Sequence, residues 1–194
     1  MSDSPAADGR IRCGWVPTDS SPAGVLYREY HDTEWGTPLR GTVPLFERVS
    51  LEAFQSGLSW LTILRKREGF RRAFSGFDVE KVARFTDRDI ARLMEDAEIV
   101  RNRAKIEATI NNARVIADLD VELSDLLWSF APPARPRPAQ LSAVPAVTPE
   151  STAMAEELKR RGFRFVGPTT AYALMQATGM VDDHTASCWV PARA

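Results

Sequence analysis

Apolar side chains recur three, four or seven residues apart along most of the chain, which is the spacing of one face of an α-helix. This pattern predicts helices over residues 43–56, 78–96, 99–117 and 151–161. No segment shows sustained alternation of apolar and polar residues or an Asn-Gly turn, so we expect no strands and predict an all-α fold. The residues on the first three stripes are Leu45, Val49, Ala53 and Ser56, then Val82, Phe85, Ile90 and Leu93, then Ile99, Ile106, Ile110, Ala113 and Ala117.

Short polar side chains mark where these helices should begin. Asp78 and Thr86 are suitable caps within 78–96, and Ser151 or Thr152 is suitable for the last helix. Residues 1–11 are polar, and we expect a disordered tail there followed by one domain over 12–194. Residues 131–149 hold six of the thirteen prolines, which predicts a loop that serves as a simple connector.

Composition places the chain among soluble globular proteins. Of its 194 residues, 44% are hydrophobic and 26% are charged, both ordinary values. No apolar run approaches the roughly 20 residues that cross a bilayer, and the first residues lack the features of a signal peptide. We therefore expect a cytoplasmic protein with no membrane partner, and nothing in the sequence requires an oligomer, so we expect a monomer.

The net charge of −1 excludes a polycation, so binding to nucleic acid would depend on local basic clusters. Such clusters are also common on solvated helix faces, which is the simpler interpretation of any one of them. The sequence contains three, at Arg65, Lys66, Arg67, Arg71 and Arg72, at Arg101, Arg103 and Lys105, and at Lys159, Arg160, Arg161 and Arg164.

Histidine and cysteine are scarce, with two of each in the chain. His184 and Cys188 are four residues apart and would share one face if that segment were helical, and Cys13 and His31 stand far upstream. Two thiolates and two imidazoles suit tetrahedral zinc, and a site with four protein ligands would be structural and would join the two ends of the chain. A capped histidine and a buried small cysteine remain the alternative from spacing alone.

Aromatic residues gather near the first of these candidate ligands, and one carboxylate falls on an apolar stripe. Glu52 lies three residues after Val49 and seven after Leu45, so it should face the core, where a carboxylate must be paired, protonated or directed into a cavity. A salt bridge to an arginine is one possibility. The other is a pocket with aromatic walls that suits a flat, cationic guest. The aromatic residues are Trp15, Tyr27, Tyr30, Trp35 and Trp60.

Residues 88–117 read as a helix, a turn near residues 96–99 and a second helix. This order is typical of a helix-hairpin-helix, whose turn amides and second helix face a DNA phosphate. Arg101 and Arg103 stand at the start of the second helix. Glycine usually tightens such a turn, and here Glu98 occupies that position.

Several stretches, in collinear order from about residue 12 to 190, resemble the bacterial type I 3-methyladenine DNA glycosylases. They are RCGWV at 12–16, YHDTEWG at 30–36, LEAFQSGLSWLTILRKRE at 51–68, DAEIVRNRAKIEATINNAR at 96–114, KRRGFRFVG at 159–167 and MVDDHTASC at 180–188. Extra residues around Ser20–Gly24 and the presence of Glu98 depart from the family pattern.

The resemblance implies the helix-hairpin-helix glycosylase fold, with one structural zinc ion held by Cys13, His31, His184 and Cys188. It implies that Glu52 contacts the base, that Tyr30 and Trp60 stack on it, and that Trp15 and Tyr27 complete the walls. It also places Leu58, after Gly57, as an apolar wedge in the DNA, and it supplies no conventional catalytic aspartate.

The implied activity is base-excision repair, in which the enzyme flips 3-methyladenine out of alkylated double-stranded DNA and hydrolyses its glycosidic bond without cutting the strand. Free 3-methyladenine would be the product, and the protein would work at the nucleoid. Two other hypotheses stay open from the sequence, namely a zinc module that binds damaged DNA without turnover and a metal or redox sensor that uses the two cysteines.

Overall fold

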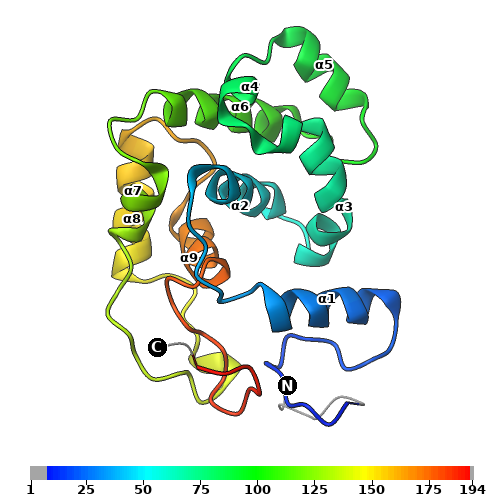
Figure 1. Cartoon of the computed structure of the whole chain (residues 1–194), viewed down its shortest axis with the longest axis vertical. Helices are drawn as coiled ribbons and strands as arrows, with labels where there is room; N and C mark the ends of the chain where they lie inside the picture. Colours follow the sequence, from blue (N-terminus) through cyan, green and yellow to red (C-terminus); the bar gives the residue numbers. More distant parts are fainter. Residues whose placement is uncertain (1–7, 193–194) are drawn as a thin grey trace.

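The computed structural model describes residues 8–192, and this part of the chain contains helices and no strand (Figure 1), which confirms the all-α prediction. In chain order, the elements are α1 (Pro22–Thr33), α2 (Thr42–Gln55), α3 (Trp60–Ala73), the short 3-10 helix η1 (Ser75–Phe77), α4 (Val79–Ala83), α5 (Asp87–Glu95), α6 (Arg103–Ala117), α7 (Leu123–Trp128), the 3-10 helix η2 (Leu141–Ala143), α8 (Pro149–Arg160) and α9 (Pro168–Ala177). Among the described residues, no helix combines the length and apolar character that a bilayer span requires.

Helix α2 lies at the centre of the molecule, with α3, α6, α7 and α9 packed around it (Figure 1). The sequence predicted one buried stripe on this helix, but nearly all of its residues from Leu45 to Phe54 are buried, including the charged Arg48 and Glu52. Ser56, which the stripe included, lies beyond the last turn and is exposed. A helix enclosed on all sides can therefore carry a carboxylate into the interior.

The predicted starts of the later helices are confirmed in part. The region 78–96 divides into α4, capped by Asp78, and α5, where Thr86 and Asp89 form a reciprocal capping box. The last predicted helix begins earlier than expected, because the Thr148 side chain accepts a hydrogen bond from the backbone N–H of Ser151 and Pro149 occupies the first turn.

Helices α5 and α6 are joined by residues 96–102, with Asn102 capping α6. No residue of this turn has a positive φ, so Glu98 fits without the glycine that the sequence led us to expect. The glycine that the turn does need is on α3: a Cβ at Gly69 would lie 2.4 Å from the carbonyl oxygen of Glu98. Gly69 therefore lets the turn rest directly on the backbone of α3.

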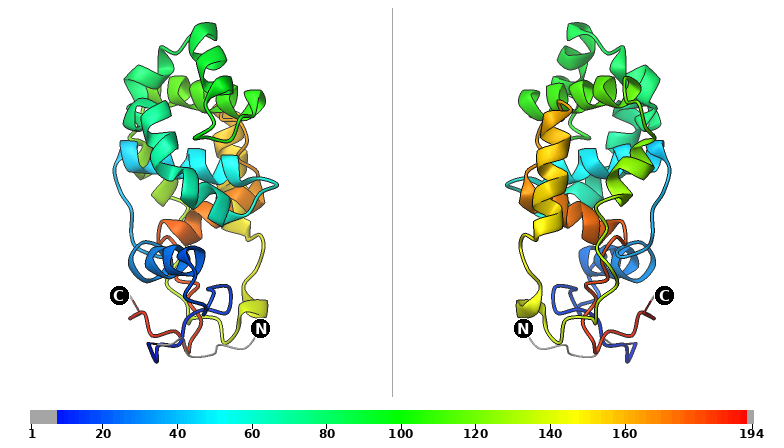
Figure 2. Two further views of the ribbon diagram at one scale, coloured as in Figure 1. Left: turned by 90° about the vertical axis from the view of Figure 1, so that its right-hand side faces the viewer. Right: turned by 90° about the vertical axis from the view of Figure 1, so that its left-hand side faces the viewer.

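The segments at the two ends of the described chain lie together below α1 and α9 (Figure 2). The backbone N–H of Trp189 donates to the carbonyl of Ile11 at 2.9 Å. The first seven residues of the predicted tail lie outside the described residues, and the division into a tail and one domain stays a prediction.

The proline-rich segment at 131–149 is more than the simple connector that we predicted. Arg135 and Arg137 pair with Asp183 and Asp182 of the C-terminal segment, at 2.8 Å in both cases. The carbonyl of Pro138 also accepts a hydrogen bond from the backbone N–H of Ala186 at 2.9 Å. The segment is thus bound to the end of the chain.

Candidate active site and metal centre

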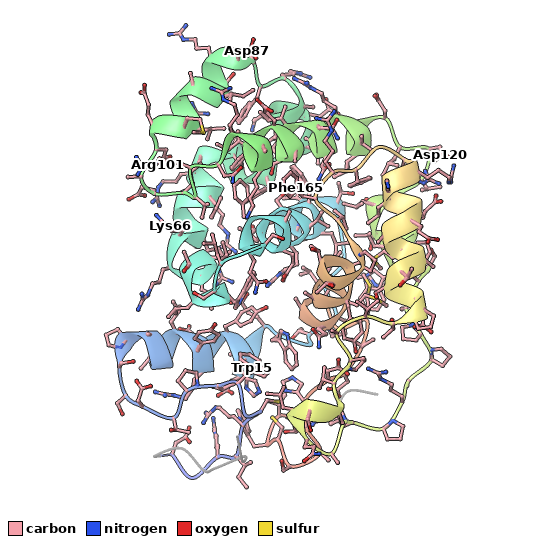
Figure 3. The ribbon with its side chains drawn as sticks, turned by 180° about the vertical axis from the view of Figure 1, so that it is seen from behind. Trp15, Lys66, Asp87, Arg101, Asp120 and Phe165 are labelled. Carbon is pink, nitrogen blue, oxygen red and sulfur yellow. The ribbon has the colours of Figure 1, made fainter. Side chains whose placement is uncertain are left out.

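A pocket of about 260 Å³ lies between α1, α2, the start of α3 and α9. Glu52 and the five aromatic residues noted in the sequence all line it, so the structure brings together side chains from separate stretches of sequence. Figure 3 shows one of them, Trp15, beside α1. The lining consists of Trp15, Tyr27, Tyr30, Trp35, Glu52, Gln55, Trp60, Leu141, Val144, Ala173, Gln176 and Asp183.

Aromatic rings form the walls of this pocket and are held by contacts outside it. The rings of Tyr30 and Trp60 are 5.3 Å apart between centroids, and those of Trp15 and Tyr27 are 5.9 Å apart. The Tyr30 hydroxyl accepts a hydrogen bond from Arg48 at 3.0 Å. The buried indole N–H of Trp60 has no hydrogen-bond partner among the described residues. The ring contacts and the hydrogen bond of Tyr30 fix the walls of the pocket in advance for a flat guest.

Glu52 is buried in this aromatic surface, with 5% of the residue exposed. Arg48, one turn earlier, bonds to Tyr30 and pairs with Glu34 at 3.5 Å. Within residues 8–192, no ion pair or hydrogen bond to Glu52 is formed, so the salt-bridge alternative is wrong. Burial raises the pKa of Glu52 to about 7, although the positive charge of Arg48 opposes the shift. The pocket therefore contains one acceptor group that the protein leaves available.

The sequence missed part of the lining. Gln55 could have been found, because it lies three residues after Glu52 on the same side of α2. Leu141 and Val144 come from the proline-rich segment, whose position no local pattern indicates. Asp183 had no predicted role, but its carboxylate lines the pocket, where it accepts hydrogen bonds from Tyr172, Gln176 and Arg135.

The four histidine and cysteine side chains form one buried group, with all ligand atoms within 4.8 Å of one another. The Sγ atom of Cys188 is 3.6 Å from Nε2 of His31 and 3.5 Å from Nδ1 of His184, and Sγ of Cys13 is 3.6 Å from the same Nδ1. Zinc bonds of 2.0 to 2.3 Å in a tetrahedron would separate the ligand atoms by about 3.6 Å. The donors and their spacing fit a four-coordinate metal site.

The other ring nitrogen of each histidine has a hydrogen-bonding partner of its own, which is the usual arrangement when a histidine binds a metal. Nδ1 of His31 lies 2.8 Å from the carboxylate of Asp32, and Arg12 binds the same carboxylate. Nε2 of His184 lies 3.2 Å from the carbonyl oxygen of Trp35. These contacts turn one nitrogen of each ring toward the cysteines. The two thiols are close enough to share a hydrogen bond, which raises the pKa of Cys13 and lowers that of Cys188.

The segment that holds His184 and Cys188 is not helical, so their spacing does not place them on one helical face. Helix α9 ends at Ala177, and Gly179 follows with a φ of +71°. A Cβ at Gly179 would lie 2.6 Å from the backbone nitrogen of Pro38, so only glycine fits there. Residues beyond this turn form an irregular loop that wraps around the four ligand atoms.

The metal group and the pocket share a wall. The ring of Trp35 lines the pocket and also contacts the rings of His31, at a centroid distance of 6.2 Å, and of His184, at 4.7 Å. Trp15 also lies 5.2 Å from the ring of His31. A disturbance of the metal ligands would therefore displace two walls of the pocket.

Leu58 is 41% exposed at the end of α2, where Gly57 has a φ of +80°. The buried Lys105 of α6 donates to the carbonyls of Phe54 and Ser56, at 2.9 and 2.6 Å, and so fixes the backbone that presents Leu58. Arg101 and Arg103 are exposed at the start of α6, and Arg103 lies 3.5 Å from Glu107. The predicted wedge and arginines are thus on the surface, where their roles stay predictions.

Comparison with known proteins now decides the family. The model of the methyladenine glycosylase family matches residues 20–191. The chain belongs to this family. It is 44% identical over 182 residues to DNA-3-methyladenine glycosylase 1 of Escherichia coli (strain K12), covering 91% of this chain and 95% of that protein.

Solved structures agree with this assignment. A crystal structure of a 3-methyladenine DNA glycosylase I has a TM-score of 0.87 at 42% identity and covers 93% of this chain and 100% of its own. A structure from Staphylococcus aureus, solved for the basis of 3-methyladenine recognition, has a TM-score of 0.84 at 37% identity and covers 91% and 96%. The predicted family and glycosylase fold are therefore confirmed.

Proposed function

We propose that this protein hydrolyses the N-glycosidic bond of 3-methyladenine in alkylated double-stranded DNA as the first step of base-excision repair. The observation that carries the proposal is the buried Glu52 carboxylate, which has no partner among the described residues and lies between aromatic rings. The named activity of the relatives supports the same chemistry.

The pocket is suited to a cationic purine. Methylation at N3 gives adenine a formal positive charge, and the faces of Tyr30 and Trp60 attract a cation by about 1 to 2 kcal/mol each in a desolvated site. Glu52 accepts a hydrogen bond from the amino group on the adenine edge. Bases that lack this donor leave a buried carboxylate unpaired and are rejected. Trp15 and Tyr27 close the remaining walls.

The charge on the base also explains how the enzyme can work with no conventional catalytic aspartate. The glycosidic bond of N3-methyladenine is already labile. Binding the cationic base and excluding other bases therefore supplies most of the required catalysis, and water captures the sugar cation. Because no lysine of the described chain lines the pocket, no Schiff base forms and the strand is not cut.

The base must leave the duplex to reach Glu52, at a cost of a few kcal/mol in stacking and pairing. We propose that Leu58 fills the gap that the flipped base leaves in the stack, because its side chain is exposed on a turn. The positive φ of Gly57 permits this turn, and Lys105 holds it by a hydrogen bond to the carbonyl of Ser56. Arg101 and Arg103, at the start of α6, bind the phosphates as in a helix-hairpin-helix. The protein would act as a monomer in the bacterial cytoplasm, at the nucleoid.

Zinc is the metal that we propose for Cys13, His31, His184 and Cys188, one ion in each chain. Four protein ligands leave no position for water, so the ion is structural. It joins the segment before α1 and helix α1 to the loop after α9, and it supports the pocket wall at Trp35.

The test is chromatographic detection of the free bases that the purified, zinc-loaded protein releases from methylated duplex DNA. We expect 3-methyladenine and no 7-methylguanine. Release of no base by folded protein would contradict the proposal and would favour a non-catalytic module that binds damaged DNA.

A further inference from the structure

The proline-rich segment supplies the most exposed part of the pocket lining. Leu141, at 38%, is more exposed than any other residue that lines the pocket, whereas Glu52 is 5% exposed. Val144 lies three residues after Leu141, across the short 3-10 helix η2, and side chains at this spacing lie on the same side of such a helix. Leu141 and Val144 therefore stand at the mouth of the pocket, and Glu52 stands at its floor.

This part of the chain is anchored on either side of η2 and not in between. Before η2, Arg137 pairs with Asp182 at 2.8 Å. After η2, the backbone N–H of Thr148 donates to the hydroxyl of Ser151, in the first turn of α8, at 2.9 Å. Within the described chain, residues 139–147 form hydrogen bonds only with one another. Apolar contacts alone therefore hold this stretch against the pocket.

The orientation of the proposed guest follows from the structure of the purine. The amino group of adenine is bonded to C6, which lies directly opposite N3 in the six-membered ring. A base that donates from its amino group to Glu52 at the floor therefore directs its N3-methyl group toward the mouth. The glycosidic bond leaves from N9, and N9 is bonded to C4, the neighbour of N3. The sugar and the methyl group thus lie at the same end of the base, the end that faces the DNA.

The mouth of the pocket offers this methyl group an apolar surface. Three of the lining residues are aliphatic, namely Leu141, Val144 and Ala173 of α9, and the side chain of Ala173 is a single methyl group. Val144 packs against the main apolar core, so its position is supported from behind. Contact of the N3-methyl group with Leu141 and Val144 removes apolar surface of both partners from water, which is favourable. Adenine without the methyl group leaves the same surface in contact with water.

We propose that Leu141 and Val144 bind the N3-methyl group of the flipped base and so distinguish the methylated purine from adenine. The inference rests on the proposed function for the orientation of the base against Glu52. Recognition is then divided among three parts of the pocket: Glu52 binds the amino edge, the aromatic rings bind the cationic faces, and the proline-rich segment binds the methyl group. One methyl group in an apolar contact changes affinity by about fourfold.

The first test is the affinity of the metal-loaded protein for free 3-methyladenine. Leu141→Ala removes most of the proposed contact, so we expect the base to bind about fourfold more weakly. Val147→Ala is the matched control, because Val147 is 41% exposed on the same segment and does not line the pocket. It should bind the base as the wild type does, and both variants should unfold at the wild-type urea concentration, since both side chains are exposed. Equal affinities of the two variants would overturn the proposal.

The second test locates the methyl group directly, by nuclear Overhauser effects between the N3-methyl protons of bound 3-methyladenine and the methyl groups of the protein. We expect cross-peaks to Leu141 and Val144, and Leu141→Ala should lose the first and keep the second. Cross-peaks to Ala173 or to aromatic rings alone would refute the inference and leave the proposed function intact. A folded, metal-loaded wild type that binds no 3-methyladenine would instead refute the proposed function, and the inference with it.

Discussion

Replacement of Glu52 by glutamine should make the protein more stable at neutral and alkaline pH. Burial raises the pKa of Glu52 from 4.5 to about 7. The folded protein therefore retains a proton that the unfolded chain has lost, and the free energy of unfolding falls as the pH rises from about 4.5 to 7. A shift of this size corresponds to about 3 kcal/mol above pH 7, since one pKa unit is about 1.4 kcal/mol. Glutamine has no charge to bury and avoids this cost.

The assay is urea unfolding of the wild type and Glu52→Gln at pH 5 and pH 8. The linkage relation predicts that the free energy of unfolding of Glu52→Gln, relative to that of the wild type, increases by about 2 to 3 kcal/mol from pH 5 to pH 8. Both proteins keep the same metal ligands, so any effect of pH on metal binding cancels in the difference. A difference that does not change with pH, or a less stable variant at pH 8, would refute the argument that Glu52 is an unpaired buried carboxylate.

Three further predictions follow from the same structure. Release of 3-methyladenine should decline as the pH falls below about 7, because protonation of Glu52 removes the negative charge that attracts the cationic base, and a pH–rate profile that stays flat from 8 to 5.5 would contradict this role. Cys188→Ser should lose the one metal ion per chain and lower the free energy of unfolding by about 3 kcal/mol or more, as measured by metal analysis and urea unfolding, whereas a metal-free wild type of full stability would refute a structural ion. Lys105→Met should cost about 1 to 3 kcal/mol by removing the donor to two carbonyls, of which that of Phe54 is buried, and should slow release from DNA more than it weakens binding of the free base, and equal effects on both would argue against a role in presenting Leu58.

The central helix and the candidate metal ligands were predictable from sequence because their signals are local or compositional. Glu52 stood out as a charged residue on an apolar stripe, and the four ligands are all the histidine and cysteine that the chain contains. Only the structure shows that Arg48 pairs with Glu34 and Tyr30 and leaves Glu52 free. The apolar stripe predicts that Glu52 is buried, but it does not predict which of the two nearby carboxylates, Glu34 or Glu52, pairs with Arg48.

Features that depend on distant parts of the chain were missed. The pairing of Arg135 with Asp183 joins residues 48 apart, and it brings the proline-rich segment to the pocket, where Leu141 and Val144 form part of the wall. No periodic pattern reports such a contact. The same holds for the hairpin turn, where the glycine that permits close packing is Gly69 of the neighbouring helix.

The central claim is that the aromatic pocket around Glu52 receives the base, and the five tryptophans provide a direct measurement. Trp15, Trp35 and Trp60 line the pocket, whereas Trp128 and Trp189 do not. Titration of free 3-methyladenine at pH 7.5 should shift the indole N–H resonances of the three pocket tryptophans and leave the other two in place. Shifts confined to Trp128 or Trp189, or no shift at any tryptophan in the folded, metal-loaded protein, would contradict the claim.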